Sequence, residues 1–264
     1  VHGFPTFWWL WRDFLGPVAD LGFTAAAIDM RGYGATDHPP RGYDPRTLAA
    51  DITGVVHALG FANAVVVGHG VGGLVAWTAA TLQGETVRAM AAVSSAHPNA
   101  LRRGMLTDPS QVRALSYVVG LQRPFLAERS LMRDDAAAVG ELLRTWVAPD
   151  ELDAAVERTY RSAFLHGKTA HCSIEFHRWA LRSIPRLDGR AFAVDMDHEV
   201  SIPVLHVHGS RDSSILISTA EQSQAWAGGS YQWHEIDGGH LLPEHRGDEL
   251  RVTLARWLLD LDNG

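Results

Sequence analysis

The chain has 264 residues, of which 46% are hydrophobic and 20% charged, as in ordinary globular proteins. Its net charge of −7, without a basic stripe, excludes the usual nucleic-acid-binding surface, so we expect no nucleic-acid partner. No apolar run reaches the roughly 18 residues of a membrane span, so we expect no membrane partner either. The one cysteine, Cys172, rules out an intrachain disulfide and favours a cytoplasmic protein.

The first hundred residues alternate between strand-like and helix-like patterns. The opening stretch VHGFP is typical of the end of a strand, so we expect N-terminal strands of the fold upstream of Val1. Short apolar runs predict strands at residues 24–30, 63–68 and 87–95, and helical spacing predicts helices at residues 46–60 and 71–82. Such alternation implies an α/β fold with a mostly parallel sheet flanked by helices.

The pattern changes after residue 98. Residues 99–199 have a helical pattern rich in Arg, Leu and Ala and contain no convincing strand. Alternation then returns, with strands expected at residues 202–210 and 230–237 and helices at residues 218–227 and 249–261. We therefore predict an α/β core formed by residues 1–98 and 200–264, interrupted by a helical cap at residues 99–199.

The stretch AVVVGHGVGG, residues 64–73, allows two interpretations. Gly68, Gly70 and Gly73 form the G-x-G-x-x-G pattern of a dinucleotide-binding loop between a strand and a helix. Such a loop also requires an acidic residue at the end of the next strand, where it binds the ribose hydroxyls. The next predicted strand ends AAVSSAHP, without a carboxylate. We therefore disfavour this interpretation and expect no cofactor.

The second interpretation is a nucleophile elbow, a sharp strand-to-helix turn whose third residue in GHGVGG would carry the attacking group. That residue is Gly70, which has no side chain. An acid and a histidine follow in the order that such a site requires, Asp212 and then His240, each just beyond a predicted strand. The backbone amides of Phe4 and Val71 are the expected donors of an oxyanion hole.

Four motifs in this order resemble those of a known family. HGFPTFWWLWRDF resembles the HGFPE-x-W-Y-S-W-R stretch of epoxide hydrolases, and DMRGYGATDHPP resembles their D-x-R-G-Y-G-x-S-D-x-P segment. GHGVGG and GGHLLPEH likewise resemble G-H-D-W-G-G and G-H-F-x-x-x-E. The chain is identified as a member of the α/β-hydrolase fold family, in an epoxide hydrolase-like branch of actinobacterial type, with Gly70 at the nucleophile position.

The resemblance implies roles for further residues. Enzymes of this branch attack the epoxide with an elbow aspartate, while two cap tyrosines polarise the ring oxygen. Tyr160 fits the first of these tyrosines, and His177 stands where the second would be and can still donate a hydrogen bond. We expect Trp8, after the oxyanion loop, and His69, beside the elbow, to contact the substrate.

Gly70 leaves two classes of function open. In the first, Asp212 and His240 activate water, and the protein is an impaired hydrolase of a small apolar epoxide or ester bound under the cap. In the second, it is an inactive relative that binds a ligand or a protein partner, because Gly70 and His177 both depart from the family pattern. The oligomeric state stays open, with a homodimer among the alternatives.

Two further expectations concern charged and histidine residues. Asp29 and Arg31 are expected to form a buried structural pair. No metal is expected, because no H-E-x-x-H spacing occurs and because we take His206 and His208, which alternate along one strand, to face opposite sides.

Overall fold

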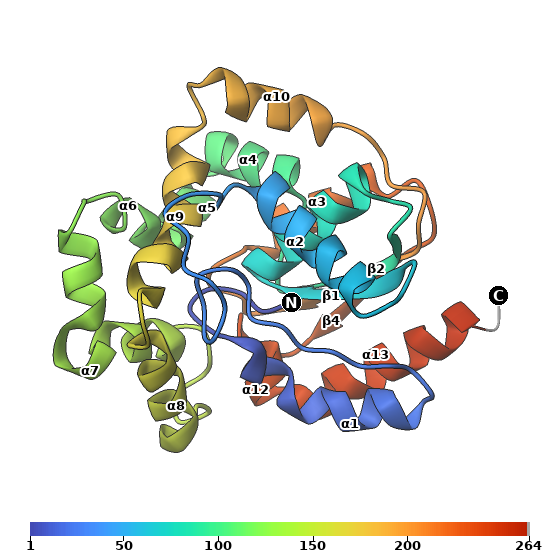
Figure 1. Ribbon diagram of the computed structural model, residues 1–264, viewed down its shortest axis with the longest axis horizontal. Coiled ribbons are helices and arrows are strands. Elements are labelled where there is room, and N and C mark those ends of the chain that lie inside the picture. Colours follow the sequence, from blue (N-terminus) through green and yellow to red (C-terminus); the bar gives the residue numbers. More distant parts are fainter. Residues whose placement is uncertain (263–264) are drawn as a thin grey trace.

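The structure, a computed structural model that describes residues 1–262, has a central sheet of four parallel strands covered by helices (Figure 1). The strands lie side by side in the order β1 (Ala64–His69), β2 (Val87–Val93), β3 (Val204–Gly209) and β4 (Tyr231–Ile236). Because all four run parallel, their carboxyl ends meet at one edge of the sheet. The segments that follow these ends are therefore brought together there.

Helices cover both faces of the sheet, with α2 and α3 on one face and α1 and α13 on the other (Figure 1). Within residues 1–262, no helix is both long and apolar enough to cross a membrane. The helices of the core are α1 (Arg12–Asp20), α2 (Pro45–Ala58), α3 (Val71–Leu82), α11 (Ile217–Ala220), α12 (Leu242–His245) and α13 (Gly247–Asp262), with 3₁₀ turns at Trp8–Trp11 and Glu221–Trp226.

The strand side chains alternate between two hydrophobic clusters. Met90 of β2 packs with Trp77 of α3 on one face. Leu205 of β3 packs with Leu254 and Trp257 of α13 on the opposite face. This alternation follows from the two-residue period of a strand, and it explains why β2 and β3 are almost entirely buried.

Helix α2 shows how local sequence sets an element. Asp44 precedes it, and its carboxylate accepts a 3.0 Å hydrogen bond from the backbone N–H of Thr47. Pro45 occupies the first turn, where no N–H is needed. Leu48 and Ile52, four residues apart, then bury the apolar face of the helix against the sheet.

Seven helices form an insertion between β2 and β3, and no strand occurs within residues 98–195. This helical insertion lies beyond the carboxyl ends of the strands, and α6, α7 and α8 lie farthest from the sheet (Figure 1). Its division from the core at residues 98/99 and 199/200 stays a prediction. Its members are α4 (Pro98–Thr107), α5 (Pro109–Ala114), α6 (Tyr117–Gly120), α7 (Leu126–Arg144), α8 (Ala154–Phe164), α9 (Thr169–Arg182) and α10 (Leu187–Asp195).

The strand predicted at residues 24–30 is not formed. A cavity of about 510 Å³ lies between this segment and β1. The edge of β1 is instead hydrogen-bonded by Val1, whose carbonyl oxygen accepts from the backbone N–H of His69 at 3.1 Å. Residues 24–30 are apolar enough for a strand, but a strand also needs a neighbouring strand within hydrogen-bonding distance of its backbone. The helix expected at residues 218–227 is also only partly α-helical, and it continues as a 3₁₀ turn.

Candidate active site

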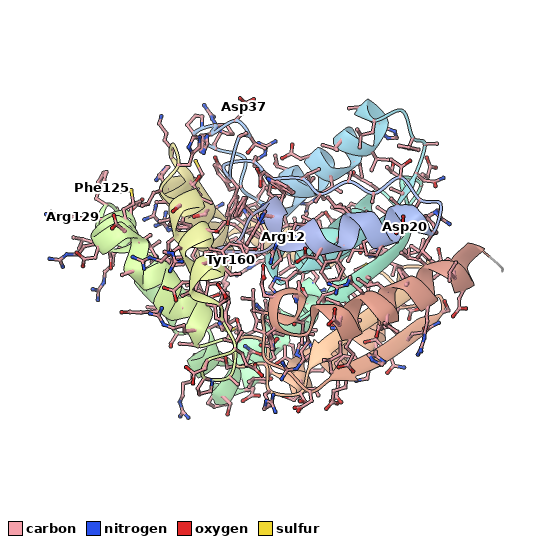
Figure 2. All side chains as sticks on the ribbon, turned by 90° about the horizontal axis from the view of Figure 1, so that it is seen from below. Arg12, Asp20, Asp37, Phe125, Arg129 and Tyr160 are labelled. Carbon is pink, nitrogen blue, oxygen red and sulfur yellow. The ribbon has the colours of Figure 1, made fainter. Side chains whose placement is uncertain are left out.

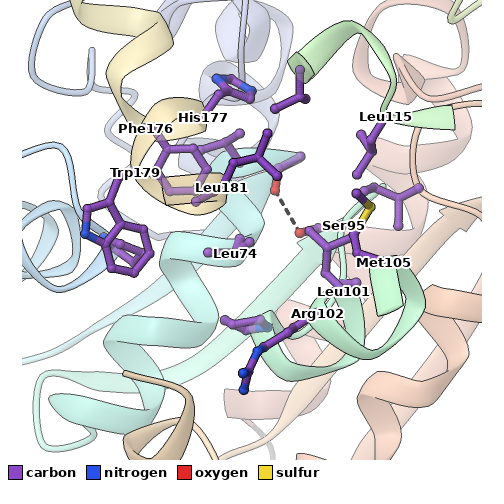
Figure 3. Close-up of a pocket in the computed structure, with 18 of the residues that line it drawn as sticks. Leu74, Ser95, Leu101, Arg102, Met105, Leu115, Phe176, His177, Trp179 and Leu181 are labelled. Atoms are coloured by element: carbon purple, nitrogen blue, oxygen red, sulfur yellow. Dashed lines mark hydrogen bonds between the residues drawn. The ribbon is translucent and has the colours of Figure 1, made fainter. Parts of the chain in front are cut away.

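The turn between β1 and α3 is built around Gly70. This residue has φ 53° and ψ −117°, and glycine adopts such a positive φ without strain. The turn is crowded, since a Cβ at Gly68 would lie 2.3 Å from the carbonyl oxygen of Gly72. Ser95 Oγ donates a 2.7 Å hydrogen bond to the carbonyl oxygen of Gly70 and holds the turn against the end of β2 (Figure 3). The backbone therefore has the positive-φ, strand-to-helix geometry of an elbow.

Asp212 and His240 form a buried pair beyond the ends of β3 and β4. His240 Nδ1 lies 2.8 Å from Asp212 Oδ2. Asp212 Oδ1 accepts hydrogen bonds from the backbone N–H groups of Ser214 at 2.8 Å and Ile215 at 2.9 Å. Burial alone would raise the pKa of Asp212, but His240 and the Ser214 N–H outweigh it, and the pKa is lowered. The ionised carboxylate holds the proton of His240 on Nδ1, so Nε2 is free to accept one.

Nε2 of His240 faces the position where a side chain of residue 70 would project. A Cβ at Gly70 would lie 3.3 Å from this nitrogen, and within residues 1–262 its neighbours inside 4 Å are atoms of His240. The His240 ring also packs edge-on against Trp146, with ring centroids 4.7 Å apart. The turn at Gly70 and the His240 ring are therefore close enough for a side chain at residue 70 to contact His240 Nε2.

A cavity of about 340 Å³ lies between this edge of the sheet and the helical insertion (Figure 3). Gly70, Val71 and His240 contribute to its wall. A mostly apolar cavity of a few hundred Å³ suits a small apolar molecule. The apolar wall includes Leu74, Leu101, Met105, Leu115, Phe176, Trp179 and Leu181.

The opening loop of the chain lies directly against the elbow. A Cβ at Gly3 would lie 2.7 Å from the carbonyl oxygen of His69 and 3.3 Å from the backbone nitrogen of Val71. Phe4 and Val71 both border the cavity. Within residues 1–262, neither of their backbone N–H groups donates to a protein acceptor. These two groups can therefore donate to an oxygen atom in the cavity.

Tyr117 and His177 are the polar aromatic residues that the helical insertion contributes to the cavity. Their ring centroids lie 6.2 Å apart. Burial raises the pKa of Tyr117, so its hydroxyl stays protonated and can donate. Burial lowers the pKa of His177 to about 4. Its Nδ1 lies 3.4 Å from the carbonyl oxygen of Ser173, which only accepts, so Nδ1 carries the proton and Nε2 is an acceptor.

Tyr160, predicted from the resemblance to donate to the ring oxygen, does not line this cavity. Its hydroxyl donates to Glu244 Oε1, and Arg12 donates to the same carboxylate at 2.8 and 3.0 Å. Figure 2 shows Tyr160 and Arg12 where the helical insertion meets α1. The sequence has two tyrosines within residues 99–199, and only the tertiary structure shows that Tyr117, not Tyr160, reaches the cavity.

Replacing Tyr160 with phenylalanine is expected to lower the free energy of unfolding by about 1–3 kcal/mol, because the buried Glu244 loses a donor. Ligand binding and any hydrolysis should stay unchanged. Urea unfolding and ligand titration check both statements, with Tyr117→Phe as the matched variant inside the cavity. A loss of ligand binding in Tyr160→Phe at unchanged stability would contradict the structural role of Tyr160.

His69 and Trp8, which the sequence analysis predicts to contact the substrate, do not line the cavity. His69 is fully buried and its Nε2 lies 2.8 Å from the carbonyl oxygen of His240. Burial, and then the charge of His240, lower the pKa of His69 to about 3, so it is a neutral donor that positions the His240 loop. Trp8 is 38% exposed and lies outside the cavity wall.

The expected pair of Asp29 and Arg31 is also wrong. Asp29 Oδ1 instead accepts a 2.8 Å hydrogen bond from the backbone N–H of Trp8. Arg31 pairs with Asp51 of α2. Asp29 therefore helps to fix the loop that follows Phe4.

His206 and His208 lie on the same face of β3, with ring centroids 5.8 Å apart, because side chains two residues apart in a strand point the same way. The expectation of opposite faces is wrong. His206 Nε2 lies 3.0 Å from the carbonyl oxygen of Ser95, and His208 Nε2 lies 2.9 Å from that of Ile215. Over residues 1–262, no group of three His, Cys, Asp or Glu side chains has a metal-binding arrangement.

Comparisons with known proteins agree with this geometry. Epoxide hydrolase A of Mycobacterium tuberculosis is 26% identical over 99% of this chain and 90% of its own length. Epoxide hydrolase 4 of Mus musculus is 25% identical over 94% of this chain and 68% of its own. A crystal structure of a Bacillus megaterium epoxide hydrolase with its product superposes with a TM-score of 0.84 at 21% identity, covering 98% of this chain and 91% of that one.

The model of the alpha/beta hydrolase fold family matches residues 1–245. The match includes the elbow at Gly70, Asp212 and His240. The order of these positions, their placement at the carboxyl edge of a parallel sheet and the match over most of the chain agree with one another. This chain belongs to the alpha/beta hydrolase fold family, and its relatives include epoxide hydrolases.

Proposed function

We propose that the protein binds a small apolar epoxide or ester in the cavity and hydrolyses it by direct attack of water, without a covalent enzyme intermediate. The observation that carries this proposal is the geometry at Gly70. A Cβ atom at this residue would lie 3.3 Å from His240 Nε2, and Gly70 has no such atom. A water molecule there would replace the missing nucleophile. The curated relatives named as epoxide hydrolases support the choice of substrate class.

The proposed reaction uses the groups around that space. His240 Nε2 takes a proton from the water while Asp212 stabilises the imidazolium that forms. For an epoxide, the water oxygen bonds to a ring carbon and the ring carbon–oxygen bond breaks. Tyr117 gives its proton to the departing oxygen, which completes a vicinal diol, and the proton held by His240 returns to Tyr117 through solvent. For an ester, the N–H groups of Phe4 and Val71 stabilise the tetrahedral oxyanion, which collapses as the ester carbon–oxygen bond breaks and His240 returns its proton to the departing alcohol.

The helical insertion, residues 99–199, is proposed to act as a cap that closes the cavity over the ligand. Its residues Tyr117 and His177 line the same cavity as Gly70 and His240 of the core. Cys172 is the one cysteine and is buried and free, which supports a cytoplasmic location. A homodimer stays a prediction.

Turnover of small epoxides and aryl esters by the unaltered protein is expected to be slow but measurable. A His240→Ala variant should lose about 10²–10⁴-fold of this rate, the usual contribution of a positioned general base. The measurement is initial rate by chromatography of the diol or acid product, with tryptophan fluorescence confirming that the variant still binds ligand. Equal rates in the two proteins would overturn the proposed chemistry.

A second candidate function is ligand binding without catalysis. His177 favours it, because its neutral ring presents an acceptor to the cavity where ring opening needs a donor. Equal rates with intact ligand binding would select this second function.

A further inference from the structure

The cavity wall carries one arginine and no carboxylate among the described residues. This residue, Arg102, belongs to α4 and is exposed. Figure 3 shows Arg102 and His177 at opposite ends of the drawn wall, with Ser95 between them. The cavity therefore has a catalytic end near Tyr117 and His177 and a cationic end near Arg102.

The cationic end opens toward solvent. Leu106, one turn from Arg102 on α4, also lines the cavity and is 66% exposed. Leu101 and Met105 of α4 continue the apolar wall inward from Arg102. A ligand that fills this wall would leave its outer end beside the guanidinium.

Arg102 differs in its contacts from three other arginines of the chain. Arg46 pairs with Asp195, and Arg186 pairs with Asp188. The guanidinium carbon of Arg103 lies over the Trp226 ring, 5.6 Å from its centroid. For Arg102, by contrast, residues 1–262 supply neither an ion pair nor a hydrogen-bond acceptor within bonding distance. Its fork of donors is therefore available to a ligand.

We infer that the cavity takes an amphipathic monoanion, whose carboxylate binds Arg102 and whose apolar body extends along α4 toward Gly70. A guanidinium matches a carboxylate with two parallel hydrogen bonds, which gives orientation as well as affinity. The inference rests on the proposed ligand cavity, but not on hydrolysis. Bound in this direction, the reacting group of a substrate would lie at the end of the ligand remote from its carboxylate.

The test compares octanoate with octanamide, which has the same apolar body and no charge. Binding is measured by the fluorescence of tryptophans, two of which, Trp146 and Trp179, line the cavity. We expect octanoate to bind the unaltered protein at least about five-fold more tightly, and this preference to weaken at high salt. Arg102→Gln should abolish the preference and leave octanamide affinity unchanged.

Arg103→Gln is the matched control, because Arg103 is the neighbouring exposed arginine on α4 and does not line the cavity. It should keep the five-fold preference. Equal affinity for the two ligands in the unaltered protein, or a preference that persists in Arg102→Gln, would overturn the inference. Failure of both ligands to bind would overturn it together with the proposed cavity. If the preference for octanoate is observed but no His240-dependent hydrolysis is found, the proposed hydrolysis is contradicted and the inference about Arg102 is supported.

Discussion

Replacing Gly70 with aspartate is expected to create epoxide hydrolysis through a covalent ester. The new Cβ would lie 3.3 Å from His240 Nε2 and border the cavity, so the carboxylate has room to turn toward a bound epoxide. His240 then activates water to hydrolyse the ester. The rate should exceed that of the unaltered protein by at least about 10²-fold, because covalent catalysis divides one difficult step into two easier ones. The rate is measured as diol formation from a panel of small epoxides.

The same substitution is expected to destabilise the protein. Residue 70 has φ 53°, and a non-glycine residue there costs on the order of 1–3 kcal/mol. For a chain of this size, this corresponds to a lower Tm by about 2–12 °C. Gly70→Asn is the control, since it has the same shape and backbone strain but no attacking carboxylate. Both variants should lose stability, and only Gly70→Asp should gain activity.

An inert Gly70→Asp variant that still binds ligand would contradict this expectation. The double variant Gly70→Asp/His177→Tyr then identifies the reason. Activity in the double variant alone would show that the acceptor presented by His177 blocks ring opening. Inactivity of both would show that the space at Gly70 does not place a carboxylate for attack, and ligand binding would stand as the function.

Acidification is expected to unfold the protein well above the pKa of its carboxylates. Burial lowers the pKa of five histidines to about 3 or 4, so the folded protein holds them neutral. In the unfolded chain each of these histidines has a pKa of about 6.5. Stability is therefore complete above that pH, and it falls as the pH decreases toward the folded values. The five residues are His2, His69, His97, His177 and His206.

The free energy of unfolding is expected to depend steeply on pH. Each histidine that stays neutral in the folded state removes about 1.4 kcal/mol of stability per pH unit in this window. Five together remove on the order of 7 kcal/mol per unit, comparable with a typical total stability of about 5–15 kcal/mol. The lowered pKa of Asp212 acts in a separate window, because its stabilisation is lost only as the pH falls below its ordinary value of 3.8. Circular dichroism should therefore show an acid midpoint between about pH 5 and 6.

His97→Gln tests the attribution to buried histidines. His97 lies outside the cavity, stacked 4.4 Å from Trp226 and edge-on to Trp77. Its replacement should lower stability at pH 8 but reduce the slope of stability against pH by about a fifth, as one of five equal contributions. His198→Gln, which removes an exposed histidine, should leave the slope unchanged. A Tm that is constant from pH 7 to pH 5 would contradict the whole account.

The sequence by itself was sufficient to predict the fold class and the chain order of the candidate site residues. All four parallel strands were predicted from the sequence, and β1 and β2 were visible as apolar runs because strands buried between two layers of helices are largely apolar. Gly70, Asp212 and His240 followed from the chain positions just beyond those strands. That Gly70 brings no side chain to the elbow was also evident from the sequence.

Only the tertiary structure decided which insertion residues meet the core. Tyr117 and Tyr160 have similar helical surroundings in the sequence, yet the first lines the cavity and the second binds Glu244. Trp8 lies near Phe4 in sequence, but its backbone N–H donates to Asp29, 21 residues away, and its side chain is 38% exposed and outside the cavity wall. Local patterns specify strands and helices, whereas these contacts depend on how separate elements pack. For the same reason the position of Arg102 in the cavity wall, without an ion-pair partner among residues 1–262, has no signal in the sequence.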